Sequence, residues 1–445
     1  MRAFLIAAMH SGAGKTAVSC ALMAALKQKG LRVQAFKCGP DYIDPMFHSG
    51  ALGVPSRNLD LFLQGERGVR ASFAAASADV AVVEGAMGYY DGLGGTAEAG
   101  AWDVANRLGL PAVLVLRPKG AGLTLAAQVR GLMQFRENSR IAALILNDCT
   151  EGCARMLTPL LERECGVPVL GYLPTMAEAR IESRHLGLMT AGEIRDLGAR
   201  LERLAEAALE HIDLALLLRL ASEKETAPPR GAPGGSLCRI AVSKDEAFCF
   251  LYEDSLDALR RAGAEIVFFS PLRDGALPEG CRGLWLCGGY PELHARALAE
   301  NAAMRGAVRR ALEAGLPTVA ECGGFLYLQE ELEGADGECY PMCGALPGRG
   351  VRTGHLVRFG YLRLRAQTDS LLFRRGEEIP AHEFHYWDST RCGEELEAKK
   401  ANGKSWRCGV VNNRLYAAFP HLHFGGELPL AERFVKACLD YGTVT

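Results

Sequence analysis

Short apolar runs alternate with helical patterns along this chain of 445 residues, and this alternation restricts the possible folds more than any other feature. In the first half the expected strands are residues 2–8, 31–37, 79–84, 112–116, 141–146 and 167–173. Helical patterns separate them, as at residues 121–135. Strands that are joined through helices run parallel to one another, so we predict a doubly wound α/β sheet.

A segment rich in Pro, Gly and Ser interrupts this alternation at residues 221–237. Such a composition is typical of a solvated linker. We therefore predict an N-terminal domain at residues 1–220 and a C-terminal domain at residues 238–445. The C-terminal domain is again α/β. Its expected strands include 238–242, 265–269 and 284–287, its helices include 253–262 and 294–314, and residues 354–423 are richer in short strands.

The first expected strand leads directly into a glycine-rich loop, which a helical pattern follows. The loop consists of Ser11, Gly12, Ala13, Gly14, Lys15 and Thr16. In such a P-loop the backbone N–H groups surround phosphate, Lys15 supplies a positive charge and the Thr16 hydroxyl reaches magnesium. The first glycine of the full motif is replaced by Met9. Because strand, loop and helix have the required order, we predict ATP binding rather than a glycine turn with a surface lysine.

Carboxylates follow the second and third expected strands. Asp41 and Asp44 lie in a turn after the second strand, Glu84 ends the third strand, and Asp91 follows it. The carboxyl ends of parallel strands meet at the sheet edge where ligands bind. Carboxylate and hydroxyl oxygens suit Mg²⁺, so Thr16, Glu84 and Asp44 are candidate metal ligands. For the two turn residues, capping of the turn is an equally simple interpretation.

The second half of the chain carries a cysteine at an expected strand-to-helix turn. Cys322 follows the apolar run 317–320 and precedes Gly323 and Gly324, which we expect to form a sharp turn into a helix. A helix N-terminus favours the thiolate form of such a cysteine. An earlier strand ends at Gly289, and His421 lies about 100 residues later. A thiol, backbone N–H groups and a histidine are the parts of a nucleophilic site.

These three signals resemble the class I, triad-type glutamine amidotransferases. The resemblance implies that Cys322 is the nucleophile, that His421 activates it, and that Gly289 and Gly323 donate to the oxyanion. This chain differs from the usual His-x-Glu motif, because the third position is occupied by His423. We expect that His423 could support His421 instead. The same departure is found in the cobyrinic and cobyric acid synthases, which this chain therefore resembles more narrowly.

Longer strings extend the resemblance over nearly the whole chain. They are residues 36–44, 56–60, 83–91, 286–292, 320–324 and 421–423. They are similar to the cobyrinic acid a,c-diamide synthase family, which includes the enzyme acting on hydrogenobyrinic acid. The resemblance implies an N-terminal P-loop domain similar to dethiobiotin synthetase, which uses ATP and Mg²⁺. It also implies a C-terminal class I glutamine amidotransferase-like α/β domain.

The family's reaction is a glutamine-hydrolysing, ATP-dependent amidation in cobalamin biosynthesis. ATP activates the a and c acetate carboxylates of a corrinoid as acyl phosphates, and ammonia released from glutamine attacks them. The resemblance places Asn147 where it could read the adenine, although a turn asparagine fits that position equally well. The candidate substrate-binding residues are Lys37, Asp41, Asp44, Arg57 and Asp91, of which Lys37 and Arg57 could balance the negative charge of the substrate.

Composition narrows the remaining classes of function. The net charge of −2 shows no basic bias, so we expect no nucleic-acid partner. No apolar run reaches the roughly 18 residues of a membrane helix, and the first apolar run is better explained as a strand than as a signal peptide. The 15 cysteines lack paired CxxC spacing, which indicates a reducing, cytoplasmic compartment. Monomer and homodimer both stay open.

Several alternatives remain at this point. The substrate could be another tetrapyrrole, as for nickel-sirohydrochlorin a,c-diamide synthase or cobyric acid synthase. A P-loop switch ATPase that binds a partner would lack the Cys/His domain, and an inactive glutaminase would not need Cys322, His421 and Gly289. Residues 381–386 do not form HExxH, because position 386 is Tyr. We therefore expect a strand pair or a pocket wall there rather than a metal site.

Overall fold

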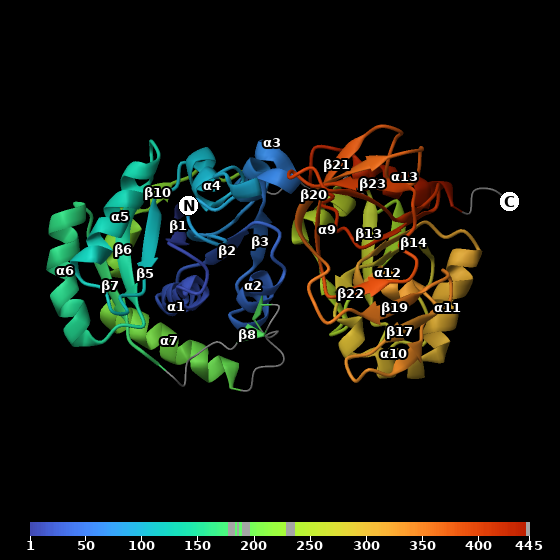
Figure 1. The fold of residues 1–445 in the computed structure, drawn as a ribbon, viewed down its shortest axis with the longest axis horizontal. Coiled ribbons are helices and arrows are strands. Elements are labelled where there is room, and N and C mark those ends of the chain that lie inside the picture. The colour runs from blue at the N-terminus through green and yellow to red at the C-terminus, as the bar shows by residue number, and fades with distance from the viewer. Residues whose placement is uncertain (177–182, 185–186, 189–195, 228–235, 442–445) are drawn as a thin grey trace. The chain divides into compact units, whose positions relative to one another are not determined.

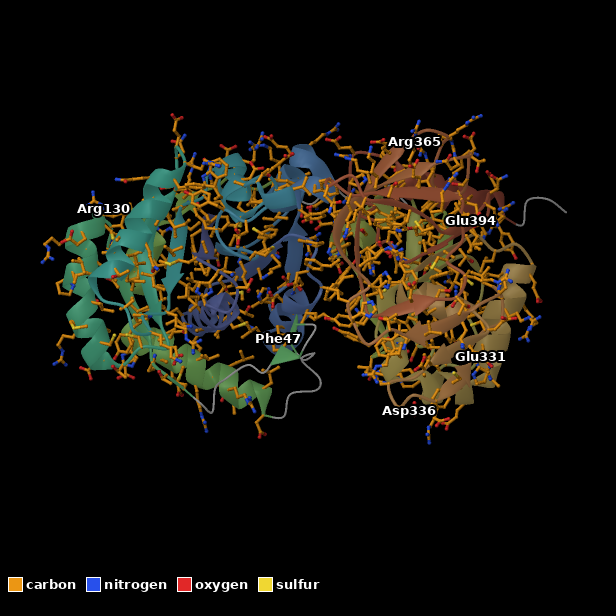
Figure 2. All side chains as sticks on the ribbon, viewed as in Figure 1. Phe47, Arg130, Glu331, Asp336, Arg365 and Glu394 are labelled. Carbon is orange, nitrogen blue, oxygen red and sulfur yellow. The ribbon has the colours of Figure 1, made fainter. Side chains whose placement is uncertain are left out.

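The computed structural model describes residues 1–176, 183–184, 187–188, 196–227 and 236–441. The chain divides into two compact units, the first formed by residues 1–61 and 65–230 and the second by residues 62–64 and 231–445 (Figure 1). Charged side chains such as Arg130, Asp336 and Glu394 are exposed at the outer surface of their own unit, whereas Phe47 is fully buried (Figure 2). None of the described helices is both long enough and apolar enough to cross a membrane.

The first unit is built on a parallel sheet with the strand order β3-β2-β4-β1-β5-β6-β7. The strands are β1 (Arg2–Ala8), β2 (Val33–Cys38), β3 (Ser56–Leu59), β4 (Val80–Glu84), β5 (Ala112–Leu116), β6 (Ile141–Asn147) and β7 (Val169–Leu173). The central strands β4 and β5 are buried along their whole length, as expected of parallel strands that are covered on both faces. The predicted doubly wound sheet is confirmed.

Helices cover both faces of this sheet (Figure 1). They are α1 (Lys15–Gln28), α2 (Ile43–Met46), α3 (Leu61–Ala74), α4 (Ala101–Leu108), α5 (Leu123–Phe135), α6 (Glu151–Cys165), α7 (Leu197–His211) and α8 (Leu214–Leu220). Buried side chains of α4, α5 and α6 share one apolar core with the strands. Helices α1 and α7 pack against each other. This arrangement leaves the carboxyl ends of the strands free for a site.

Two strands that pair with the main sheet of the first unit were not expected from the sequence. Strand β3 carries the polar residues Ser56, Arg57 and Asn58, which concealed its pairing with β2. Strand β10 (Ser222–Glu223) pairs antiparallel with β1, although it lies inside the predicted linker. The N–H of Lys224 also donates to the carbonyl of Met1 at 2.8 Å. The beginning of the predicted linker therefore belongs to the first unit, while residues 228–235 lie outside the described residues.

The second unit has a central sheet with the order β13-β11-β14-β16-β26-β25. Its strands are β11 (Cys238–Ser243), β13 (Ala264–Phe269), β14 (Cys281–Leu286), β16 (Thr318–Glu321), β25 (Val410–Val411) and β26 (Leu415–Ala418). All neighbours are parallel except β25 and β26. The predicted α/β architecture of this half is confirmed as well.

The helices of the second unit are α9 (Glu253–Arg261), α10 (Ala295–Glu300), α11 (Ala302–Glu313), α12 (Gly323–Leu328) and α13 (Leu430–Asp440). The single helix expected at 294–314 is divided at Asn301, whose side chain accepts a hydrogen bond from the N–H of Met304 at 3.2 Å and caps α11. An asparagine that bonds the backbone in this way favours a helix start over a helix interior.

Smaller sheets surround the central one, and only some of their strands lie between residues 354 and 423, where short strands were expected. One contains β20 (Arg358–Ala366), β21 (Glu378–His385), β23 (Leu396–Lys399) and β24 (Ser405–Cys408), and another contains β17 (Glu331–Glu333), β18 (Cys339–Pro341), β19 (Arg349–Arg352) and β22 (Trp387–Ser389). A short pair joins β12 (Phe248–Phe250) to β15 (Gly288–Gly289). Strand β21 pairs antiparallel with β20, which agrees with the strand pair expected for this segment.

Candidate functional site

The glycine-rich loop lies between β1 and α1, and its backbone requires glycine at two positions. Gly12 and Gly14 have φ values of 81° and 95°, a region that side chains rarely adopt. Lys15 begins α1 and its ammonium donates to the carbonyls of Met87 and His10. Burial, with a further contribution from the nearby Lys37, lowers the pKa of Lys15 to about 8, so it still carries its charge at neutral pH. These features suit a loop that holds phosphate.

Glu84, at the end of β4, is the centre of a buried polar cluster. Its Oε1 accepts hydrogen bonds from the Thr16 hydroxyl at 2.7 Å and from Lys37 Nζ at 3.0 Å, and its Oε2 lies 3.1 Å from His48 Nε2. The side chain is 1% exposed. Burial raises the pKa of Glu84, but Lys37, His48 and Thr16 together lower it well below its ordinary value. Glu84 is therefore ionised beside the phosphate loop.

Lys37 links two of the three candidate metal ligands. Its ammonium forms ion pairs with Asp44 and Glu84, and it lies 4.0 Å from Asp41 Oδ2. Burial lowers the pKa of Lys37, but Asp44, Glu84 and Asp41 raise it well above its ordinary value. The sequence suggested that Lys37 could balance the charge of a substrate. In the structure its ammonium already contacts Asp44 and Glu84, and its side chain is almost fully buried.

The other candidate residues of the first unit form hydrogen bonds to backbone groups. Asp41 Oδ1 accepts from the N–H groups of Ile43 and Asp44, which is the turn-capping alternative. Asp91 is exposed, and its Oδ2 accepts from the N–H of Gly88 at 3.0 Å. The amide of Asn147 donates to the carbonyl of Ala13 at 3.0 Å. Asn147 therefore supports the phosphate loop directly.

Arg57 lies on β3 opposite Phe36 and is half-buried, so the structure places it in the sheet next to β2. Two further residues take part in this region, although no separate sequence signal predicted their roles. His48 bonds Glu84 and Ser56, and Asn58 donates to the carbonyls of Gly39 and Asp41. Asn58 lies in residues 56–60, one of the strings that resemble the family. His48 belongs to no such string, and only the fold brings it to Glu84.

In the second unit, Cys322 lies at the junction between β16 and α12. It adopts φ 48° and ψ −104°, a backbone region unusual for a residue with a side chain, and its N–H donates to the carbonyl of Ala418. Strained backbone of this kind is often found at nucleophile turns. We expected Gly323 and Gly324 to provide the sharp turn, but they lie inside the helix without positive φ. The turn is made by Cys322 itself.

The glycines are required by close packing instead. A Cβ atom on Gly324 would lie 2.2 Å from the carbonyl oxygen of Leu286. A Cβ atom on Gly323 would lie 3.2 Å from the backbone nitrogen of Gly289, and one on Gly288 would lie 2.4 Å from Cε1 of His421. The Gly288–Gly289 pair therefore lies against both the nucleophile turn and the histidine, which brings the four predicted catalytic residues to one place.

The environment of Cys322 and His421 keeps both side chains neutral. Burial, with smaller contributions from Glu292 and Glu383, raises the pKa of Cys322 far above its ordinary value. Burial, with His382 and His385, lowers the pKa of His421 to about 3. We expected the helix N-terminus to favour a thiolate, but α12 is short and burial in this acidic surrounding outweighs it. The pair is a thiol and a neutral imidazole.

Both units match domains of known proteins. Residues 4–188 match the CobQ/CobB/MinD/ParA nucleotide binding domain, and residues 239–428 match the CobB/CobQ-like glutamine amidotransferase domain. The cobyrinate a,c-diamide synthase of Clostridium acetobutylicum is 39% identical over 98% of this chain and 100% of its own length. Those of Clostridium tetani and Thermoplasma volcanium are 38% and 36% identical over 99% and 98% of this chain, and over 100% and 97% of their own lengths. The chain belongs to the cobyrinate a,c-diamide synthase family.

Membership in this family agrees with the predicted resemblance along the whole chain. A solved chain, PurLQS from Thermotoga maritima, matches 46% of this chain and 98% of its own length, with a TM-score of 0.33 and 18% identity. This similarity is too low to support a conclusion about this chain. A switch ATPase alone does not account for a second unit that matches a glutamine amidotransferase.

The position where the usual motif has Glu is occupied by His423, which has its own contacts. Its Nδ1 accepts from the N–H of Gly425 at 3.1 Å, and its ring packs on Tyr252 with the centroids 4.9 Å apart. Nearby, Nε2 of His385 lies 2.9 Å from Oε1 of Glu383. Glu383 and His385 lie on β21, which ends at His385. Among the described residues there is no group of three or more His, Cys, Asp or Glu side chains that could hold a metal ion.

Proposed function

We propose that this protein uses ATP and glutamine to amidate the a and c acetate carboxylates of cobyrinic or hydrogenobyrinic acid. The main support is that one chain carries two sites. In the first, the threonine of a phosphate loop contacts a buried glutamate. In the second, a pair of glycines packs against both the cysteine turn and a histidine. Its relatives of nearly equal length are named cobyrinate a,c-diamide synthases. On this proposal, residues 1–220 form the amidoligase domain and residues 238–445 the glutaminase domain.

The proposed glutaminase reaction begins with a neutral pair. His421 takes the thiol proton as the sulfur of Cys322 attacks the amide carbon of glutamine. The N–H groups of Gly289 and Gly323 hold the resulting oxyanion, and their fixed positions stabilise it without reorganisation. His421 then returns the proton to the departing ammonia, which leaves a thioester on Cys322. Water hydrolyses the thioester to glutamate and restores the thiol.

The proposed ligase reaction takes place at the phosphate loop. A substrate carboxylate attacks the terminal phosphorus of ATP, which releases ADP and forms an acyl phosphate. Ammonia attacks the acyl carbon, and inorganic phosphate leaves with the bonding electron pair. The backbone of residues 11–14 and the ammonium of Lys15 neutralise the charge that develops on the phosphates. Asn147 and Asp91, near the same loop, are proposed to contact nucleotide and substrate.

The residues around Thr16 suit a magnesium ion that is bound together with ATP. Mg²⁺ prefers one or two carboxylates plus phosphate oxygens to a complete protein cage. The Thr16 hydroxyl and the ionised Glu84 lie in contact at the loop, and Asp44 is joined to Glu84 through Lys37. When bound, the ion supplies positive charge at the phosphates. Thr16, Glu84 and Asp44 are the proposed ligands, and Asp41 and Arg57 are proposed to lie near the substrate.

The experiment that tests this function is an assay of the purified protein with ATP, Mg²⁺ and glutamine. Cobyrinic acid, hydrogenobyrinic acid and nickel-sirohydrochlorin are offered separately, and mass spectrometry counts the carboxylates converted to amides. Two conversions on either corrinoid support the proposal. Conversion of nickel-sirohydrochlorin alone contradicts the proposed substrate.

We also propose a cytoplasmic protein without a nucleic-acid partner, consistent with 15 free cysteines and a net charge of −2. Light scattering distinguishes monomer from homodimer.

A further inference from the structure

Glu321, the residue directly before the nucleophile, has a fully buried carboxylate with two donors from distant segments. It is the last residue of β16 and is 1% exposed. Its Oε1 accepts a hydrogen bond from the N–H of Leu422 at 2.8 Å. Its Oε2 accepts one from the indole Nε1 of Trp285 on β14 at 3.1 Å. Both oxygens of this carboxylate are therefore used inside the protein.

The first of these bonds reaches the segment that carries the histidine. Leu422 lies between His421 and His423, and Cys322 follows Glu321 in the chain. One carboxylate thus joins the nucleophile strand to the backbone beside the base. The same segment is held by a pair of backbone bonds between His421 and His382 and by the Tyr416 hydroxyl, which donates to the carbonyl of Pro420.

We propose that Glu321 is a positioning residue, whose ionised carboxylate holds the 421–423 segment so that His421 can take the proton of Cys322. This inference rests on the proposed glutaminase function and assigns a role to a residue that the Cys/His motif does not include. Loss of the Leu422 bond would let the imidazole move relative to the thiol. A displacement of about 1 Å in such a pair can lower the rate about 100-fold.

Only the ionised carboxylate accepts from both donors without conflict, because protonation places an O–H on one of the two oxygens, which then faces an N–H group. Burial raises the pKa of Glu321 to about 7, although the bonds from Leu422 and Trp285 lower it. Glutaminase activity should therefore rise with pH through about 7.

The stability of the folded protein should change with pH in the opposite direction. Since the folded-state pKa exceeds the ordinary value of 4.5, the folded protein binds more protons than the unfolded chain between these pH values, and the free energy of unfolding falls as pH rises.

Four titratable groups near Glu321 have pKa values that are shifted away from this interval. Burial raises the pKa of Cys287, after β14, to about 12, and raises that of Tyr416, on β26, well above its ordinary value. The pKa of Cys322 is raised and that of His421 lowered to about 3, as described above. Glu292 is the exception near Cys322, because burial raises its pKa to about 7. An experiment must therefore separate Glu321 from Glu292.

The test compares glutamate release from glutamine by the full-length protein and by Glu321→Gln, between pH 5.5 and 8.5. We expect the variant to lose about 100-fold in kcat/KM at the upper end and to lose the rise near pH 7. Glu292→Gln should keep that rise. Glu321→Gln should unfold at the same or a higher temperature than the parent at pH 8, because a neutral amide replaces a buried charge. A merely structural role predicts instead that stability falls with activity while the pH profile keeps its shape.

Trp285→Phe provides a second measurement that does not depend on how Glu321→Gln folds. It removes one donor from the carboxylate, favours the protonated form and should move the rise in activity to higher pH. A pH profile of Glu321→Gln that matches the parent, or an unmoved rise in Trp285→Phe, overturns the role of Glu321. A parent protein that releases no glutamate contradicts the glutaminase function itself, so the two failures are distinguishable.

Discussion

The hydroxyl oxygen of Thr16 lies 2.7 Å from Oε1 of Glu84, although 68 residues separate them in the chain. Thr16 is the last residue of the phosphate loop and Glu84 ends the strand next to β1, so parallel pairing of β1 with β4 brings them together. Lys37 contacts the same oxygen of Glu84 from β2. The site at this sheet edge is therefore a compact group of charges rather than a row of independent ligands, and removal of one charge affects the others.

Glu84→Gln and Asp91→Asn should respond differently to magnesium. Glu84→Gln keeps the size of the side chain but removes the charge that the metal needs, so we expect its loss of synthesis to ease at high Mg²⁺. The Asp91→Asn defect should not ease, because Asp91 is exposed beside Gly88 and is proposed to contact substrate. The measurement is a magnesium titration of each variant, with its melting temperature.

If both residues only shape the glycine-rich segment after β4, both variants should lose stability together and neither should respond to magnesium. Glu84→Gln also leaves Lys37 with one fewer carboxylate charge. A drop in melting temperature that is larger for Glu84→Gln than for Asp91→Asn is therefore expected in either case, and the magnesium response is the deciding result.

Lys15→Ala should abolish synthesis while leaving the glutaminase intact. Loss of one charge-stabilising group in phosphoryl transfer typically lowers the rate about 1,000-fold. Glutamate release should persist, because Cys322 and His421 lie in the other unit. The check is to assay both activities on one preparation, with Arg130→Ala, an exposed position of α5, as the control. Product formation by Lys15→Ala at the parent rate would remove the phosphate loop from the mechanism.

Cys322→Ser should lose glutamine-dependent synthesis and retain synthesis with added ammonia. The thiol acts only in the release of ammonia from glutamine, whereas ATP activates the carboxylate elsewhere. The rate of amide formation with each nitrogen donor, measured by mass spectrometry at saturating ATP, tests this separation. Equal loss with both donors would contradict the assignment of two distinct sites.

Gly324→Ala should destabilise the second unit, because its new methyl group would lie 2.2 Å from the backbone oxygen of Leu286. Overpacking of this kind costs about 1–3 kcal/mol of unfolding free energy. The matched control is Gly306→Ala in α11, where the nearest atom is the tip of the flexible Arg310 side chain at 3.1 Å. Denaturant unfolding of both variants checks the difference. Equal stability of the two variants would show that α12 can move away from β14 and make room for the methyl group.

The sequence alone determined the architecture and the chemical types of the site residues. Apolar runs and intervening helical patterns are local features, so β1, β4, β5 and β6 could be located to within a residue or two. The glycine-rich loop before Lys15 is likewise local, because its backbone geometry requires glycine at fixed positions. Cys322 and His421 were recognisable because a strand, a glycine turn and a histidine follow one another in a characteristic order.

The tertiary structure decided how these residues are partnered and charged. Nothing near Lys37 in the sequence shows that Glu84 and Asp44 both contact its ammonium, and nothing near His48 shows that it reaches Glu84. The neutral state of Cys322 and the role inferred for Glu321 depend in the same way on burial and on segments about 100 residues apart. The physical reason is that hydrogen-bond partners and pKa values depend on distances and desolvation in the folded chain, which the local pattern does not contain.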